Sequence, residues 1–267
     1  MSARDRYRVA SKHWHRLPGL RQVQTDAAAD ATLAIDKAVA AAGISVLDGD
    51  PGTGKSFLLK TILETLAIPH WYLPVGPLAT GKAFEVGLLK EVYDRMDPPG
   101  RVDRSKDRSD LRIDLAEELS LEPGVVIIDD FKPSGRAGIE DIRWLSEQPG
   151  NQTAFILAGN DLSRLMRSNP PFYSRVMQIV PFEPFAKEEA AALMAGVHPL
   201  LEAANLKVLW RLHDEHTRGN FRALAIFLEF AIPIAAGLGV TRVTDEVLDL
   251  AVAQINKRPP VIRQEAA

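Results

Sequence analysis

The 267-residue sequence contains no cysteine, which excludes disulfide bonds, thiolate catalysis and cysteine-based zinc sites. Long hydrophobic runs are also missing, because no apolar segment approaches the roughly 18 residues that suggest a membrane-spanning helix. The N-terminus is charged but no apolar segment follows it, so a signal peptide is not predicted. From these absences we expect a cytoplasmic protein without a membrane partner.

The composition is otherwise ordinary for a globular protein, with 46% hydrophobic and 25% charged residues and a formal net charge of −3. The charge is unevenly spread, because residues 1–21 hold six lysines and arginines against a single acid, with Tyr7 and Trp14 among them. Such a stretch is either an arm that binds nucleic acid or a protein partner, or a solvated leader. The sequence leaves both alternatives open.

One motif organises the chain, a match to the phosphate-loop pattern G-x-x-x-x-G-K-[ST] by Gly49, Asp50, Pro51, Gly52, Thr53, Gly54, Lys55 and Ser56. Residues 44–47 before it predict a buried strand, and residues 57–63 after it predict a helix. Backbone N–H groups of such a loop and the positive end of the helix bind phosphate. A glycine-rich turn that binds nothing is disfavoured by the whole strand–loop–helix arrangement.

The phosphate loop makes ATP and Mg²⁺ the expected ligands. We assign the eight loop residues and Phe57 to nucleotide binding. Lys55 is expected to reach the β- and γ-phosphates, and the Ser56 hydroxyl to ligate Mg²⁺.

A second signal is the β-branched run of residues 125–128, which is followed by Asp129 and Asp130. The run predicts a fully buried strand, and ligands collect at the carboxyl ends of strands in a parallel sheet. We assign Asp129 to magnesium, directly or through water, and Asp130 to orienting the attacking water. The alternative is that the pair merely begins a surface turn.

Strands and helices alternate along the first two thirds of the chain, which predicts a parallel α/β sheet with helices on both faces. Beyond residue 184 only helices are expected. We divide the chain into a basic arm (1–24), a phosphate-loop ATPase core (25–184), a small all-helical lid (185–257) and a flexible tail (258–267). Strands are expected at 44–47, 70–75, 125–128, 153–158 and 176–180, and helices at 26–42, 54–67, 82–96, 110–120, 137–147, 161–167, 186–195, 199–215, 219–236 and 244–256.

Over about residues 20–255 the chain resembles the AAA+ ATPases. The resemblance rests on the phosphate loop, the Asp129-Asp130 pair, Asn160 after a buried strand, Ser174-Arg175 before the last strand, and residues 219–222 (Gly-Asn-Phe-Arg). More narrowly, its compactness and the stretch 153–185 are similar to the DNA-transposition regulators of the Mu B, TnsC and TniB type. This resemblance implies a homo-oligomer, either a ring or a helical filament.

The resemblance also implies catalytic roles outside the phosphate loop. Asn160 matches the sensor-1 residue that helps to place the attacking water. Arg175 matches the arginine finger that reaches the γ-phosphate of a neighbouring subunit, and Arg222 matches the sensor-2 residue of the lid. The ordinary alternatives are a strand-end cap for Asn160 and solvated or ion-paired arginines at 175 and 222.

The acidic pair departs from the family pattern, which usually reads Asp-Glu where this chain has Asp129-Asp130. Because the second carboxylate is one methylene shorter, it is expected to reach the attacking water less well. We therefore expect slow hydrolysis, stimulated by DNA or a partner, with ATP acting mainly as an assembly switch.

DNA contact is predicted for the turn 76–82, which in the resembling ATPases faces the DNA in a central channel. Thr80 and Lys82 are the candidates, with Arg101 and Arg104 as weaker ones. One phosphate contact per subunit, repeated along an assembly, would give salt-sensitive binding without sequence preference. Alternatively, Lys82 simply begins a helix.

Together these features predict a bacterial or phage-encoded regulator that oligomerises on double-stranded DNA with ATP and recruits or activates a transposase. Two alternatives remain. One is a helicase loader or initiator-like ATPase, and the other is a signalling ATPase that remodels a protein and never binds DNA. The last alternative predicts that DNA has no effect on assembly.

Overall fold

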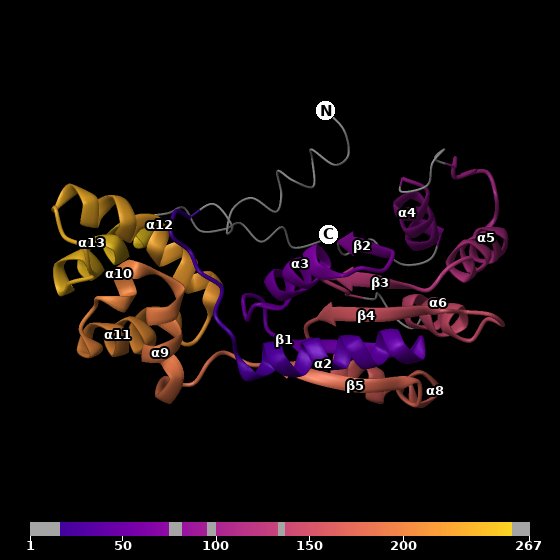
Figure 1. The fold of residues 1–267 in the computed structure, drawn as a ribbon, viewed down its shortest axis with the longest axis horizontal. Helices are drawn as coiled ribbons and strands as arrows, with labels where there is room; N and C mark the ends of the chain where they lie inside the picture. The colour runs from indigo at the N-terminus through magenta and orange to yellow at the C-terminus, as the bar shows by residue number, and fades with distance from the viewer. Residues whose placement is uncertain (1–16, 75–81, 95–99, 133–136, 258–267) are drawn as a thin grey trace. The chain divides into compact units, whose positions relative to one another are not determined.

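The computed structural model describes residues 17–74, 82–94, 100–132 and 137–257 (Figure 1). These residues form two compact units, one spanning 26–183 and the other combining 17–25 with 184–257. The prediction for Thr80 and the predicted tail 258–267 lie outside the described residues.

The larger unit is built on a sheet of five parallel strands in the order β2-β3-β4-β1-β5. Strand β3, which ends at the acidic pair, and its neighbour β4 are buried along their whole length, as their uninterrupted apolar runs require. The predicted parallel α/β sheet is therefore confirmed. The strands are β1 (Ile44–Gly49), β2 (His70–Pro74), β3 (Gly124–Asp129), β4 (Thr153–Gly159) and β5 (Val176–Phe182).

Helices cover both faces of this sheet (Figure 1). Side chains alternate along β3, so that Val126 and Ile128 pack under α4–α8, whereas Val125 and Ile127 pack under α2 and α3. The sheet is thus the middle of three layers. The helices are α2 (Asp26–Ala41), α3 (Lys55–Thr65), α4 (Lys82–Tyr93), α5 (Arg108–Ser120), α6 (Ala137–Ser146), α7 (Leu162–Arg167) and α8 (Pro170–Tyr173).

The differences from expectation in the larger unit include two boundaries and one additional helix. Strand β5 continues past residue 180 through Pro181, which is tolerated because β5 lies at the edge of the sheet. Helix α5 begins at Arg108 rather than 110, because the Asp107 side chain caps it by accepting the Asp110 amide at 3.0 Å. Helix α8 was not predicted, although Asn169 as its cap and Pro170 in its first turn are typical start signals.

A buried ionic cluster joins α4, α5 and α6. The Glu85 and Asp141 side chains are 0% and 1% exposed, and both contact the Arg108 guanidinium, Glu85 at 3.1 Å. Arg112 lies 3.7 Å from Asp141 and stacks over the Trp144 ring at 4.4 Å. Burial raises the pKa of the Glu85 carboxyl, so the two carboxylates depend on Arg108 for compensation of their charge.

The smaller unit contains only helices: α9 (Lys187–Val197), α10 (Pro199–Glu202), α11 (Leu206–Leu212), the π-helical turn η1 (His213–Thr217), α12 (Phe221–Gly237) and α13 (Asp245–Asn256). The single helix expected over 199–215 is divided. It is interrupted where Asn205 caps a new helix by accepting the Lys207 amide at 2.9 Å.

The described end of the predicted N-terminal arm packs onto this helical unit. Leu17, Leu20 and Val23 lie against its core, and the Arg21 amide donates to the Val197 carbonyl at 2.8 Å. Arg21 also forms an exposed ion pair with Glu202 at 2.7 Å. Residues 17–24 of the predicted arm therefore pack against the helical unit.

Among the described helices, none alone is long and apolar enough to span a membrane. One bent pair, Leu206–Thr217 with Phe221–Gly237, passes the same length and composition test only when taken together, with a bend of 116°.

Candidate nucleotide-binding site

The phosphate loop connects β1 to α3, and its glycines are required by the backbone. A Cβ atom at Gly49 would lie 1.9 Å from the carbonyl oxygen of Phe182 on the neighbouring strand β5. Gly52 and Gly54 have φ angles of 92° and 106°, a region that side chains disfavour. The sequence therefore forces a tight turn at the carboxyl edge of the sheet, directly before the N-terminus of a helix.

Lys55 is folded into this loop. Its ammonium group donates to the carbonyls of Gly49 and Asp50, the latter at 3.0 Å, and lies 3.4 Å from the Thr53 hydroxyl. The residue is only 8% exposed, and a buried ammonium needs compensating acceptors. The loop thus holds a cation among its own carbonyls, within the turn where phosphate oxygens would bind.

Ser56, the first loop hydroxyl after the lysine, contacts the acidic strand end. Its Oγ donates to Oδ1 of Asp129 at 3.0 Å, across 73 residues of sequence. The same oxygen accepts the amide of Asp130 at 2.9 Å. The structure therefore brings together the two residues that the sequence assigned to magnesium.

Tyr72 completes the surroundings of Asp129 and was missed by the sequence analysis. It lies on β2 opposite Ile127, and its hydroxyl donates to Oδ2 of Asp129. Burial, and then the charge of Asp129, raises the pKa of the Tyr72 hydroxyl far above its ordinary value, so Tyr72 stays a donor. Tyr72 could have been identified from its position near the carboxyl end of β2, the strand next to the acidic strand β3.

This set of oxygens fits Mg²⁺ held jointly with a nucleotide. Mg²⁺ prefers hard oxygen ligands and is usually bound by one or two protein groups plus phosphate oxygens and water. Ser56 and Asp129 would supply the protein ligands. The described residues hold no group of three or more histidines and carboxylates that could bind a metal by itself. When bound, the ion would neutralise charge on the phosphates.

Asp130 and Asn160 follow the adjacent strands β3 and β4 at the same edge of the sheet. Asp130 has a left-handed φ of 55° and a side chain that is 59% exposed, and it pairs with Lys132 at 3.1 Å. Asn160 is half-buried, and its only described polar contact is a long one of 3.5 Å to Asp161. Both polar groups are thus placed beside the Ser56–Asp129 contact, and neither is locked in a strong network.

A second residue missed by the sequence analysis is Asp48, one residue before the loop. Its carboxylate accepts the amides of Leu162 and Ser163, both at 2.9 Å, and the Ser163 hydroxyl. Because these residues come two and three positions after Asn160, Asp48 ties the phosphate-loop strand to the segment that follows the predicted sensor. No local pattern in the sequence distinguishes this aspartate from a surface acid.

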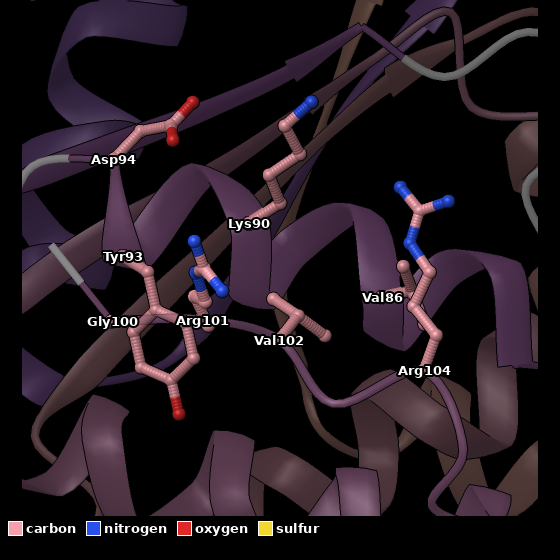
Figure 2. Close-up of a pocket in the computed structure, with 8 residues that line it drawn as sticks. All are labelled: Val86, Lys90, Tyr93, Asp94, Gly100, Arg101, Val102 and Arg104. Carbon is pink, nitrogen blue, oxygen red and sulfur yellow. The ribbon is translucent and has the colours of Figure 1, made fainter.

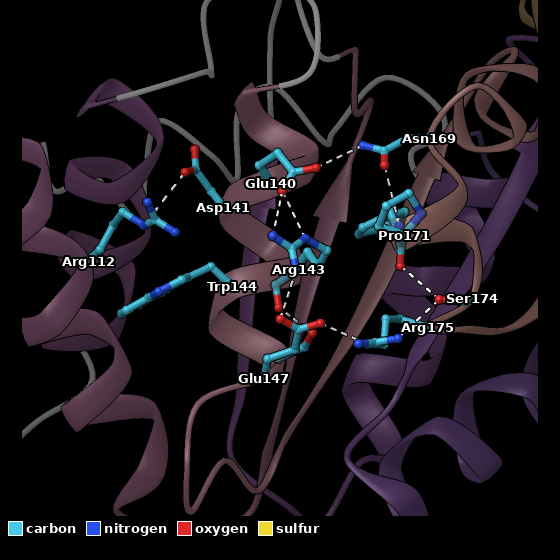
Figure 3. A network of polar contacts seen from close by, with 12 residues as sticks. Arg112, Glu140, Asp141, Arg143, Trp144, Glu147, Asn169, Pro171, Ser174 and Arg175 are labelled. Carbon is cyan, nitrogen blue, oxygen red and sulfur yellow. Dashed lines mark hydrogen bonds and ion pairs between the residues drawn. The ribbon is translucent and has the colours of Figure 1, made fainter.

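Arg175 belongs to a chain of polar contacts along α6 and the segment after α8 (Figure 3). Its Nε donates to Glu147 at 2.8 Å and a terminal nitrogen donates to Ser174 at 3.1 Å. Glu147 also accepts from Arg143 at 2.9 Å. The Arg175 side chain is half exposed and makes no contact with the phosphate loop of its own chain among the described residues.

Arg222 lies in the helical unit, as the second residue of α12, and is exposed. The motif before it forms a tight turn, in which Gly219 has a φ of 76° and its carbonyl accepts the Phe185 amide at 3.0 Å. The Asn220 side chain then caps α12 through the Ala223 amide at 3.1 Å. The Gly-Asn pair of this motif therefore sets where α12 begins.

The described candidates for DNA contact gather around α4. Lys82 begins this helix and is exposed. Arg101 and Arg104 line a cavity of about 250 Å³ together with Lys90 and Tyr93 (Figure 2). Lys82 and Lys90 are eight residues apart on one helix, which places them on neighbouring parts of the same side. None of these four cations forms an ion pair within the part of the chain that the structure describes.

Residues 39–165 match the family model described as an AAA domain. No curated protein sequence matches the chain. Among solved structures, ORC2 from Aeropyrum pernix has a TM-score of 0.63 at 18% identity, covering 91% of this chain and 70% of ORC2. The Holliday junction branch migration motor RuvB from Thermotoga maritima has a TM-score of 0.60 at 16% identity, covering 88% and 70%. The Walker-type ATPase of Pyrococcus abyssi has 0.59 at 15%, covering 89% and 73%. The chain therefore has the AAA+ phosphate-loop α/β fold, and its residues 39–165 are similar to the AAA domain family.

Proposed function

We propose that this AAA domain protein binds and slowly hydrolyses ATP, oligomerises on double-stranded DNA and regulates transposition by recruiting or activating a transposase. The observation that carries the proposal is the Lys55, Ser56 and Asp129 arrangement. It presents a cation, a hydroxyl and a carboxylate around one phosphate-binding turn, which supports magnesium-nucleotide binding.

Oligomerisation is supported by the position of Arg175. This arginine is half exposed and contacts Glu147 instead of its own phosphate loop. An arginine that completes a neighbour's site would supply positive charge where the transferred phosphoryl group becomes more negative. In the proposed mechanism Asp130 and Asn160 position the water, the neighbour's Arg175 stabilises the phosphoryl group, and Arg222 senses the nucleotide from the helical lid.

Slow turnover is proposed from the exposed, short side chain of Asp130. Its pairing with Lys132 at 3.1 Å competes with a role as a base. ATP then acts mainly as the signal for assembly, and hydrolysis as the signal for release.

Contact with DNA is supported by the four cations around α4. Lys82, Lys90, Arg101 and Arg104 carry positive charge that no described acid neutralises through an ion pair, whereas Arg108, Arg143 and Arg175 are all paired. Gly100 is held against the Tyr93 ring, where a Cβ atom would approach to 3.1 Å, and this contact fixes the start of the segment that carries the two arginines. Lys90, Arg101 and Arg104 line one cavity together with Asp94, and cations grouped in this way suit the regularly spaced phosphates of a duplex.

A second candidate is an ATPase that loads or drives another DNA machine, such as a helicase. It is favoured by the structural likeness to ORC2 and to the branch migration motor RuvB. A reconstituted transposition reaction that requires this protein would favour the first candidate, and ATP-dependent transfer of a helicase onto DNA would favour the second.

The DNA face is tested by charge reversal. Lys82→Glu and Arg101→Glu should weaken binding to a duplex at all sequences and lower the slope of log affinity against log salt by about 1 each. ATP binding should remain. Lys37→Glu, at an exposed lysine of α2, is the matched control. Unchanged duplex binding by both variants would remove this face from the proposal.

A further inference from the structure

Three groups from different parts of the chain contact the Asp129 carboxylate. Its Oδ1 accepts the Ser56 hydroxyl at 3.0 Å and the Asp130 amide at 2.9 Å, and its Oδ2 accepts the hydroxyl of Tyr72. The residue itself is 7% exposed. Each oxygen of this nearly buried carboxylate therefore has a donor, and Tyr72 is the donor described for Oδ2.

The register of the sheet explains why Tyr72 reaches this oxygen. Tyr72 on β2 is opposite Ile127 on β3, so Asp129 is two residues further along the same face of the sheet. An aromatic side chain is long enough to reach such a diagonal neighbour. The contact is thus a consequence of strand pairing, and a tyrosine at 71 or 73 would point to the opposite face.

The hydrogen bond from Tyr72 restricts rotation of the Asp129 carboxylate. The terminal torsion of an aspartate is broad, and donors on one oxygen alone leave the group free to turn. With Ser56 on one oxygen and Tyr72 on the other, the Asp129 carboxylate has one orientation, in which Oδ1 faces the first turn of α3. Outer-shell partners of this kind orient metal ligands, and their loss commonly weakens metal binding.

We infer that Tyr72 is a positioning residue for magnesium: it holds the Asp129 carboxylate toward Ser56, so that the two oxygens are already arranged when magnesium arrives with the nucleotide. The inference rests on the proposed ATP site and adds a residue that no phosphate-loop motif contains. Tyr72 touches neither nucleotide nor metal in this account, and acts through Asp129 alone.

The test compares nucleotide binding with and without magnesium. Fluorescent ADP is titrated into the full chain in EDTA and at increasing Mg²⁺ concentrations, for the wild type and for Tyr72→Phe, which keeps the ring and removes only the hydroxyl. Tyr173→Phe, at an exposed tyrosine of α8, is the matched control. Thermal unfolding followed by circular dichroism verifies that each variant is folded.

The Tyr72→Phe variant should bind ADP in EDTA within twofold of the wild type, and the Mg²⁺ concentration for half-maximal tightening should rise about tenfold. The Tyr173→Phe control should show no rise. In an Asp129→Asn background, Tyr72→Phe should add no further change, because the two residues act as a unit.

Three outcomes are decisive against the inference. An unchanged Mg²⁺ dependence in Tyr72→Phe would overturn it, and so would an equal loss of affinity in EDTA and in magnesium, which would show a merely structural role. A further shift in the Asp129→Asn background would also overturn it. A wild-type protein that binds no ADP with or without magnesium would instead refute the proposed ATP site itself.

Discussion

Replacing Glu147 by glutamine should free Arg175 and raise ATP turnover in the assembled state. In the single chain the Arg175 guanidinium pairs with Glu147 at 2.8 Å. An arginine that acts on a neighbour's phosphate must leave this partner, so the ion pair opposes the active arrangement. Glutamine keeps the size of the side chain and removes the charge.

The expected change in turnover depends on how far the Arg175–Glu147 ion pair is exposed to water. The side chains of Arg175 and Glu147 are 50% and 32% exposed, and ion pairs with such access to water contribute about 0.2–1 kcal/mol. Losing 1 kcal/mol corresponds to about a fivefold change in an equilibrium. We therefore expect Glu147→Gln to raise turnover by at most about fivefold.

The assay is phosphate release at saturating ATP and duplex DNA, measured over a range of protein concentrations. Glu117→Gln, at an exposed glutamate of α5, is the control and should leave turnover unchanged. Because Glu147 also binds Arg143, the comparison is repeated with Arg175→Ala, where Glu147→Gln should have no effect. A fall in turnover, or the same rise without Arg175, would refute the reasoning.

Three further predictions concern residues of the larger unit. Gly49→Ala places a methyl group against a neighbouring carbonyl, and should cost about 2–3 kcal/mol in thermal unfolding and abolish binding of fluorescent ATP. Arg108→Ala leaves the Glu85 and Asp141 carboxylates buried without their closest cation. Breaking a buried ion pair lowers the free energy of unfolding by roughly 3–5 kcal/mol. Because the Arg108 side chain is 38% exposed, we expect a loss near the lower end of this range, measured by urea unfolding. The raised pKa of Glu85 means that this cost should shrink as the pH falls toward 4.5 and its charge is lost, and grow as the pH rises to 7. Asp130→Glu lengthens the side chain that is proposed to position the attacking water, and should raise phosphate release severalfold. A fall would contradict the explanation given for slow turnover.

The phosphate loop and the sheet could be predicted because their signals are local. A glycine-rich turn between an apolar strand and a helix specifies both the fold of residues 44–65 and its anion-binding chemistry. Uninterrupted apolar runs identified β3 and β4 as buried strands, and the rule that ligands collect at strand ends placed Asp129 and Asn160 on one edge. The phosphate-loop α/β fold could therefore be predicted from pattern, whereas the AAA+ assignment came from the resemblance of the whole motif set to that family.

Sequence patterns could not predict the roles of Tyr72, Asp48 and Glu147. Each acts on a residue far away in sequence: Tyr72 on Asp129 through the pairing of two strands, and Asp48 on the start of α7. Glu147 reaches Arg175 because a short helix, α8, turns the chain back toward α6. Such contacts depend on register and on crossing elements, which single-sequence periodicity does not specify.

The measurement that tests the central claim most directly is fluorescence anisotropy of a labelled duplex titrated with this protein. It is performed with a slowly hydrolysed ATP analogue, with ADP, and with the Lys55→Ala variant. We predict cooperative binding that requires the triphosphate and Lys55 and that weakens steeply with salt. Absence of binding at low salt with every nucleotide would contradict the account, and would indicate a protein client in place of DNA.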